Sequence, residues 1–162
     1  MVFEMYTLKK LSVLALKLNS KIVSAESCTA GLLSASLTEI PGSSAFFEQG
    51  YITYSNHSKT SVLGVENKIL KKYGAVSEQV AKQMAEGALK RSNSTIAISI
   101  TGIAGPGGSD CKPEGLVCFA VTKENGKIRT ETMEYGPLGR SKVRSSAVKT
   151  ALNLLFEEMS VI

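Results

Sequence analysis

The sequence contains few of the residue types on which several classes of function depend. It has one histidine, His57, and three cysteines without paired spacing, whereas zinc sites use clusters of these ligands. We therefore expect reduced thiols and no metal. No apolar run approaches the roughly 20 residues that cross a bilayer, and the N-terminus lacks the pattern of a signal peptide. These absences predict a cytoplasmic protein that does not contact membranes.

Aromatic residues are also scarce, with no tryptophan, five tyrosines and five phenylalanines. The formal net charge is +5, but lysines and arginines are scattered along the chain and none of the usual nucleic-acid-binding modules is present. We therefore expect no nucleic-acid partner. Two interpretations of the charge stay open, namely a solvated basic surface or a site for a small anionic ligand.

The length of 162 residues and the hydrophobic content of 43% fit a single domain over residues 1–162. A β-branched run over 95–100 predicts a central strand that is buried on both faces. Asn125 and Gly126 predict a hairpin turn between two later strands. The pattern predicts strands over 21–23, 50–54, 115–121 and 127–133, and helices over 4–19, 32–40, 66–73 and 139–159, with another beginning at Ser77. This order predicts an α/β fold, a three-layer α/β/α sandwich around a mixed, mostly parallel sheet.

A hydroxyl-rich stretch, Ser24-Ala25-Glu26-Ser27-Cys28-Thr29-Ala30-Gly31, joins a predicted strand to a predicted helix. The first N–H groups of a helix lack partners and can hold an oxyanion or a phosphate. Two interpretations stay open: Ser27 or Thr29 caps the helix, or Ser27 is a nucleophile. Cys28 is a rival nucleophile, although a small buried hydrophobe is the commoner role of such a cysteine.

A base for the hydroxyl is available further along the chain. Tyr54 ends a predicted strand and Lys59 lies about one helical turn into the next segment, so both side chains can face one point. Lys59 can accept a proton only if it is neutral, which requires a pKa about 3 units below the usual ~10.4, and burial supplies shifts of that size. His57 is the competing base, although a lone loop histidine is more often solvated.

A glycine-rich loop, Thr101-Gly102-Ile103-Ala104-Gly105-Pro106-Gly107-Gly108, follows the predicted central strand. It matches neither the Walker pattern nor the dinucleotide fingerprint. Its glycines would allow the backbone to approach a phosphate or ribose closely, and a purely structural loop is the alternative. Arg140 and Arg144 lie one turn apart on the last predicted helix, where they are either solvated or candidates for binding a substrate phosphate.

Five ordered segments resemble the CinA carboxy-terminal domain family, and the resemblance extends from about residue 5 to residue 157. These segments are 25–31, 41–47, Gly50 with Tyr54-Ser55-Asn56 and Lys59, 74–77, and 101–106. The resemblance implies a nicotinamide-nucleotide amidase without a cofactor, which hydrolyses nicotinamide mononucleotide to nicotinate mononucleotide and ammonia in NAD recycling. It also implies a standalone copy of the domain that forms at least a dimer.

The resemblance assigns three roles that agree with the interpretation of the residues. Ser27 matches the nucleophile, Lys59 the general base, and Tyr54 the phenol that assists proton transfer. The N–H groups of Thr29, Ala30 and Gly31 would hold the oxyanion, and the loop from Thr101 to Gly105 would contact the substrate.

Two departures from the family pattern affect these segments. Many members carry Gly where this chain has Ala30, and Asp-Gly-Gly where it has Gly107-Gly108-Ser109-Asp110. The second difference alters the loop at the expected site, while neither removes a proposed reacting group. The alternative function is a nucleotide-binding regulatory module of the same fold without turnover. A role in DNA uptake or damage response finds no support in the sequence motifs.

Overall fold

Five strands form one sheet in the order β2-β1-β3-β4-β5 in the computed structural model, which describes residues 2–109 and 111–161. Its strands are β1 (Ile22–Glu26), β2 (Phe47–Ile52), β3 (Ile96–Gly102), β4 (Leu116–Lys123) and β5 (Ile128–Glu134). Strand β1 pairs in parallel with β2 and β3, whereas β4 is antiparallel to both β3 and β5. Only β4 therefore runs against the other four, as expected for a mixed, mostly parallel sheet.

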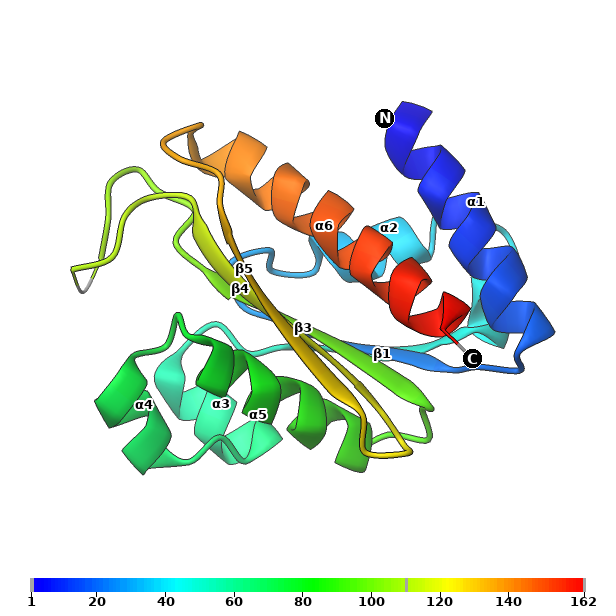
Figure 1. The fold of residues 1–162 in the computed structure, drawn as a ribbon, viewed down its shortest axis with the longest axis horizontal. Coiled ribbons are helices and arrows are strands. Elements are labelled where there is room, and N and C mark those ends of the chain that lie inside the picture. Colours follow the sequence, from blue (N-terminus) through cyan, green and yellow to red (C-terminus); the bar gives the residue numbers. More distant parts are fainter. Residues whose placement is uncertain (1, 110, 162) are drawn as a thin grey trace.

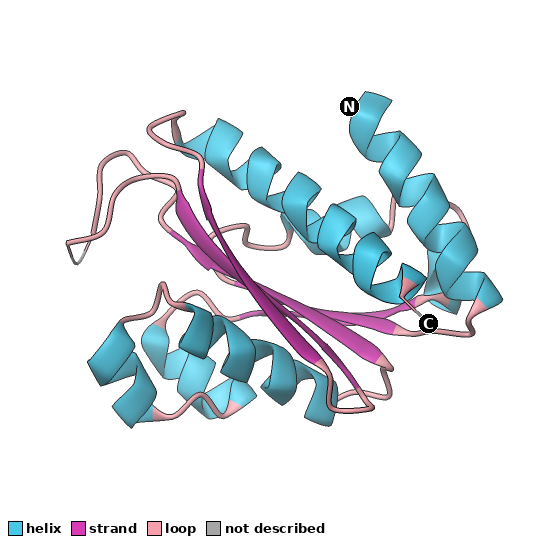
Figure 2. Ribbon diagram, viewed as in Figure 1, coloured by secondary structure: helices cyan, strands magenta, loops and turns pink. Residues whose placement is uncertain are grey.

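Helices cover both faces of this sheet (Figure 1). One face carries α1 (Val2–Lys17), α2 (Leu32–Leu37) and α6 (Arg140–Ser160), and the other carries α3 (Asn56–Leu63), α4 (Asn67–Tyr73) and α5 (Glu78–Lys90). A short 3-10 turn, η1 (Ser43–Ala45), precedes β2. Figure 2 shows the sheet as the middle layer, and the expected three-layer α/β/α sandwich is confirmed. No helix in the described part of the chain is long and apolar enough to cross a membrane.

Strand β3 lies at the centre of the core, with six of its seven residues buried. Ile98 and Ile100 pack into the cluster beneath α6, while Ala97 packs into the cluster beneath α5. The strand predicted over 95–100 is therefore covered on both faces, as expected. Because the carboxyl ends of β1 and β3 lie side by side, the residues that follow them meet at one edge of the sheet.

Most elements differ from the sequence prediction by one or two residues at their ends, and β1, β2 and α2 differ by three. Strand β2 covers 47–52 rather than 50–54, because the buried Phe46 fixes the chain before the strand begins. Helix α2 ends at Leu37 rather than at residue 40. There the hydroxyl and N–H groups of Thr38 both return to carbonyls of the preceding turn and close the helix.

Helices α3 and α5 approach each other closely at Gly87. A Cβ atom on this residue would lie 1.9 Å from the carbonyl oxygen of Leu63, which is backbone and cannot rotate away. We predict that Gly87→Ala lowers the free energy of unfolding by about 3 kcal/mol, at the upper end of the usual cost of overpacking. Urea denaturation measures this change, with the exposed Lys82→Ala as a control that stays within about 0.5 kcal/mol of the parent. Equal stability of the two variants would contradict the close contact.

Candidate active site

Ser27 lies in the turn that follows β1. Its backbone N–H donates to the carbonyl of Ile100 on β3 at 2.9 Å, and the residue is 7% exposed. Helix α2 begins only at Leu32, and its N-cap residue is Gly31, which offers no side chain. Neither Ser27 nor Thr29 therefore caps the helix, and this alternative interpretation of the two residues is wrong.

Lys59 reaches Ser27 from the other side of the cleft. Ser55 caps α3 and forms a capping box with Ser58, which places Lys59 one turn into the helix. The Lys59 amine donates to Ser27 Oγ at 2.9 Å, to the carbonyl of Thr53 at 3.0 Å and to that of Tyr54 at 3.4 Å. All three partners are neutral oxygens, although the Lys59 side chain is one of the largest that are fully buried.

Burial without a carboxylate partner lowers the pKa of Lys59 to about 8. The nearby Cys28 thiol would oppose this shift only as a thiolate, but burial raises the pKa of Cys28 to about 11. The thiol is therefore neutral over the range in which Lys59 titrates. A pKa near 8 leaves roughly one fifth of the amine neutral at pH 7.4, against about one part in a thousand for an ordinary lysine.

Tyr54 is placed differently from the expectation. The residue is 57% exposed, and its hydroxyl accepts a hydrogen bond from Arg140 at 2.8 Å rather than contacting Ser27 or Lys59. The alternating burial of β2 continues past Ile52, so Thr53 is buried and Tyr54 is exposed at the mouth of the cleft. The structure therefore brings together two of the three expected side chains, and Tyr54 contributes a backbone carbonyl to the pair.

The two arginines on α6 that are candidates for binding a phosphate contact different parts of the structure. Arg140 lines the cleft and donates to the carbonyl of Gly105 as well as to Tyr54. Arg144, one turn later, donates to the carbonyl of Thr29 at 3.1 Å and lies outside the cleft lining. The two guanidinium groups therefore bind different segments, and a phosphate contact by Arg144 stays a prediction.

Most of the expected oxyanion donors are already engaged. The N–H of Ala30 donates to the carbonyl of Ser27, and that of Gly31 donates to the carboxylate of Glu26. Of the three expected N–H groups, only that of Thr29 has no hydrogen-bond partner among the described residues. Ala30 adopts φ +47°, a left-handed conformation that costs a non-glycine residue about 1 kcal/mol and explains why glycine suits this position.

A cavity of about 650 Å³ opens beside Ser27 and Lys59. The loop after β3 forms one wall, and Gly102, Ile103, Ala104 and Gly105 all line it as expected. Thr101 also lines the cavity, although its hydroxyl donates to the carbonyl of Ala75 and so holds the loop. The glycine-rich segment therefore lies where a ligand of Ser27 would extend.

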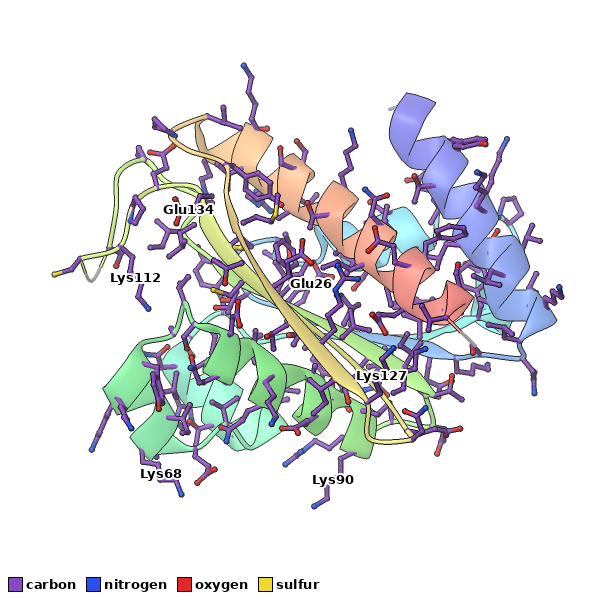
Figure 3. The ribbon with its side chains drawn as sticks, viewed as in Figure 1. Glu26, Lys68, Lys90, Lys112, Lys127 and Glu134 are labelled. Atoms are coloured by element: carbon purple, nitrogen blue, oxygen red, sulfur yellow. The ribbon has the colours of Figure 1, made fainter. Side chains whose placement is uncertain are left out.

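Sequence reasoning missed three cations at this cavity, Lys71, Lys72 and Lys112. Lys112 extends from the loop between β3 and β4 toward α4 and α5, where its amine donates to the carbonyls of Tyr73 and Val76 (Figure 3). The described residues that line the cavity include no Asp or Glu. The adjacent pair Lys71-Lys72 was the available signal, but only the fold shows that the end of α4 faces Ser27.

The rival groups do not join the pair. His57 is exposed and lies outside the cavity lining, so it has no contact with Ser27. Cys28 is 5% exposed, and its raised pKa keeps the thiol protonated, the unreactive form. Among the described residues no group of three His, Cys, Asp or Glu side chains is placed to hold a metal ion.

Comparison with known proteins identifies the family of this chain. The profile of the CinA C-terminal domain matches residues 6–159. The chain belongs to this family. It is 47% identical over 152 residues to a CinA-like protein of Chlorobium phaeobacteroides (strain BS1), covering 90% of this chain and 36% of that protein. A putative competence-damage inducible protein of Caldicellulosiruptor bescii is 49% identical over 138 residues, covering 83% of this chain and 33% of its own length.

Solved structures of the CinA superfamily share the fold along nearly the whole chain. The competence/damage inducible protein CihA from Agrobacterium tumefaciens is 44% identical with a TM-score of 0.87, and the match covers 93% of this chain and 94% of that one. The competence damage-inducible protein A from Klebsiella pneumoniae is 32% identical with a TM-score of 0.93, covering 98% of each chain. This chain spans about a third of the length of the curated relatives that it matches.

Proposed function

We propose that this CinA-family chain is an amidohydrolase that converts nicotinamide mononucleotide to nicotinate mononucleotide and ammonia. The observation that carries the proposal is the distance of 2.9 Å between Ser27 Oγ and a buried Lys59 amine whose pKa is lowered to about 8. A hydroxyl beside a partly neutral amine is an activated nucleophile. The family resemblance supplies the substrate.

Each step of the reaction uses a group at the cleft. Ser27 Oγ attacks the carboxamide carbon while the Lys59 amine takes its proton, and the N–H of Thr29 donates to the developing oxyanion. The tetrahedral intermediate breaks its C–N bond as Lys59 returns the proton to the departing nitrogen, which releases ammonia. Water then attacks the acyl-enzyme with Lys59 as the base, and the new carboxylate leaves as Ser27 regains its proton.

The positively charged side chains that line the cavity, Arg140, Lys71 and Lys72, favour a phosphorylated substrate over the free riboside. Arg140 now donates to two neutral oxygens, and a phosphate dianion is a stronger acceptor than either. Lys71 and Lys72 stand at the same cavity, and no described carboxylate there competes for them.

We predict that Arg140→Gln lowers the preference for the mononucleotide over the riboside about tenfold, the value of one charge-assisted hydrogen bond of roughly 1.5 kcal/mol. The measurement is the ratio of kcat/KM for the two substrates. Lys142→Gln is the matched control, because Lys142 is exposed on the same helix and lies outside the cavity lining. A preference unchanged by Arg140→Gln would place the phosphate elsewhere.

One observation favours the alternative of a nucleotide-binding regulatory module. The Tyr54 hydroxyl and two of the three expected oxyanion N–H groups are bound to other partners, which leaves few groups to stabilise a transition state. Calorimetric titration with nicotinamide mononucleotide and an ammonia assay on the same sample separate the two functions. The amidase releases ammonia and nicotinate mononucleotide in equal amounts, whereas the module binds without releasing either. Assembly into at least a dimer and a cytoplasmic location stay predictions, and light scattering tests the first.

A further inference from the structure

Glu26 is a buried carboxylate that the proposed reaction does not use. It is the last residue of β1 and directly precedes Ser27, and its exposure is 0%. Figure 3 shows it in the interior of the molecule, between the sheet and the helices on one face. Because Glu26 lies outside the cavity lining, any effect that it has on a ligand must pass through its neighbours.

The two oxygens of Glu26 accept four hydrogen bonds from the start of α2. Oε2 accepts from the N–H groups of Gly31 at 3.0 Å and Leu33 at 3.1 Å. Oε1 accepts from the N–H of Ser34 at 2.9 Å and from its hydroxyl at 2.6 Å. All four donors lie beyond the turn that contains Ser27, so the carboxylate closes this turn and serves as the side-chain cap that Gly31 lacks.

The turn that Glu26 closes has a backbone conformation that most residues do not favour. Ala30 and Gly31 have φ values of +47° and +95°, both in the left-handed region. On the other side, Ser27 is tied by its own N–H to Ile100 of β3. The nucleophile is therefore fixed at two points, by the sheet through Ile100 and by α2 through Glu26.

We propose that Glu26 is a positioning residue for Ser27. The carboxylate of Glu26 holds the turn so that the Ser27 hydroxyl stays within hydrogen-bond distance of the Lys59 amine. This proposal rests on the proposed function in so far as that function makes Ser27 the nucleophile. Four donors require a carboxylate, because the amide of glutamine has one oxygen and would turn its NH₂ group toward two further donors. Glu26 does not contact the base directly, since the Lys59 amine bonds to Ser27 and to the carbonyls of Thr53 and Tyr54.

The test compares Glu26→Gln with the parent by two measurements. The first is steady-state turnover of nicotinamide mononucleotide, and the second is labelling by a fluorophosphonate, in which Ser27 oxygen bonds to phosphorus and fluoride leaves. We expect kcat and the labelling rate per folded molecule each to fall at least about 50-fold, as a displacement of about 1 Å does at a reacting centre. KM should stay within about twofold and the pH at which Lys59 titrates should not move.

Two further variants keep the test decisive. Ser34→Ala removes one of the four donors and leaves the other three, so labelling should fall about two- to fivefold in a chain that folds even where Glu26→Gln does not. Glu48→Gln, on the neighbouring strand β2, makes the same chemical change outside the turn and should label like the parent.

The outcomes separate the two proposals. Labelling rates per folded molecule that equal the parent's in both Glu26→Gln and Ser34→Ala show a purely structural role and overturn the positioning of Ser27. A parent chain that the probe does not label at Ser27 overturns it as well. If the parent releases no ammonia but its labelling still slows in Glu26→Gln, the substrate assignment fails while the positioning role stands.

Discussion

Ser27→Ala abolishes ammonia release from nicotinamide mononucleotide, with a fall in kcat of at least about 10⁴-fold, as expected when the nucleophile of an acyl-transfer site is removed. The change deletes only one oxygen, in a residue that is 7% exposed, and the hydrogen-bond partner of this oxygen is the Lys59 amine. Binding should persist, since the cavity and its cations are unchanged. Turnover measured with calorimetric titration on the same preparation therefore shows lost chemistry with a Kd within about threefold of the parent's, a change below 1 kcal/mol.

Cys28→Ala is the matched comparison because the thiol lies next to the hydroxyl. We expect this variant to lose less than about tenfold in kcat, as a protonated thiol contributes packing rather than attack. If Cys28→Ala is inactive while Ser27→Ala keeps its rate, the sulfur is the nucleophile. If both keep the parent rate, neither atom attacks and the assignment of the nucleophile fails.

The meeting of Ser27 and Lys59 could be predicted because each follows from local patterns. A strand followed directly by a hydroxyl, and a helix whose cap Ser55 lies four residues before Lys59, place both side chains at the carboxyl edge of the parallel strands. Periodicity likewise gave the central strand and the helices on its two faces. These features depend on residues close together in the chain.

The features that the sequence did not predict are side-chain directions, which depend on tertiary contacts. Arg140 and Arg144 lie one turn apart on α6, yet Arg140 donates to the carbonyl of Gly105 in the cavity wall and Arg144 to the carbonyl of Thr29. The alternation along β2 buries Thr53 and leaves Tyr54 exposed, where its hydroxyl meets Arg140 rather than the reacting pair. Glu26 gave no sequence signal of its own, because a carboxylate at a strand end is ordinarily solvated and its four donors follow only from the turn.

Lys59→Met should lower kcat by at least about 10³-fold, since it removes the base that activates Ser27, while making the protein more stable at pH 7. A lysine whose pKa falls from 10.5 to about 8 on folding costs about 3 kcal/mol when it is protonated in the folded state. Methionine has similar length and no charge, but it gives up the hydrogen bonds to Ser27 and Thr53. We therefore expect a net gain of about 2 kcal/mol in the free energy of unfolding at pH 7.

The pH dependence fixes the sign of this effect. Below pH 8 both the folded and the unfolded parent hold the Lys59 proton, so the cost is complete and constant. Between pH 8 and 10.5 only the unfolded chain holds it, so the parent gains stability as the pH rises and the advantage of Lys59→Met disappears. Cys28 titrates in both proteins and largely cancels in their difference. Urea unfolding at pH 7 and pH 10 measures this change, with Lys82→Met as an exposed control.

The same ionisation should govern turnover by the parent. The value of kcat/KM should rise about tenfold per pH unit below pH 8 and level off above it, because only the neutral amine accepts the proton of Ser27. The pyridinium ring of nicotinamide mononucleotide is positively charged, so it should lower the pKa of Lys59 further in the complex. The rise of kcat with pH should therefore level off at a lower pH than the rise of kcat/KM. A profile without an ionisation near pH 8, together with a Lys59→Met variant less stable than the parent at pH 7, would show that the amine does not enter the reaction as a buried neutral base.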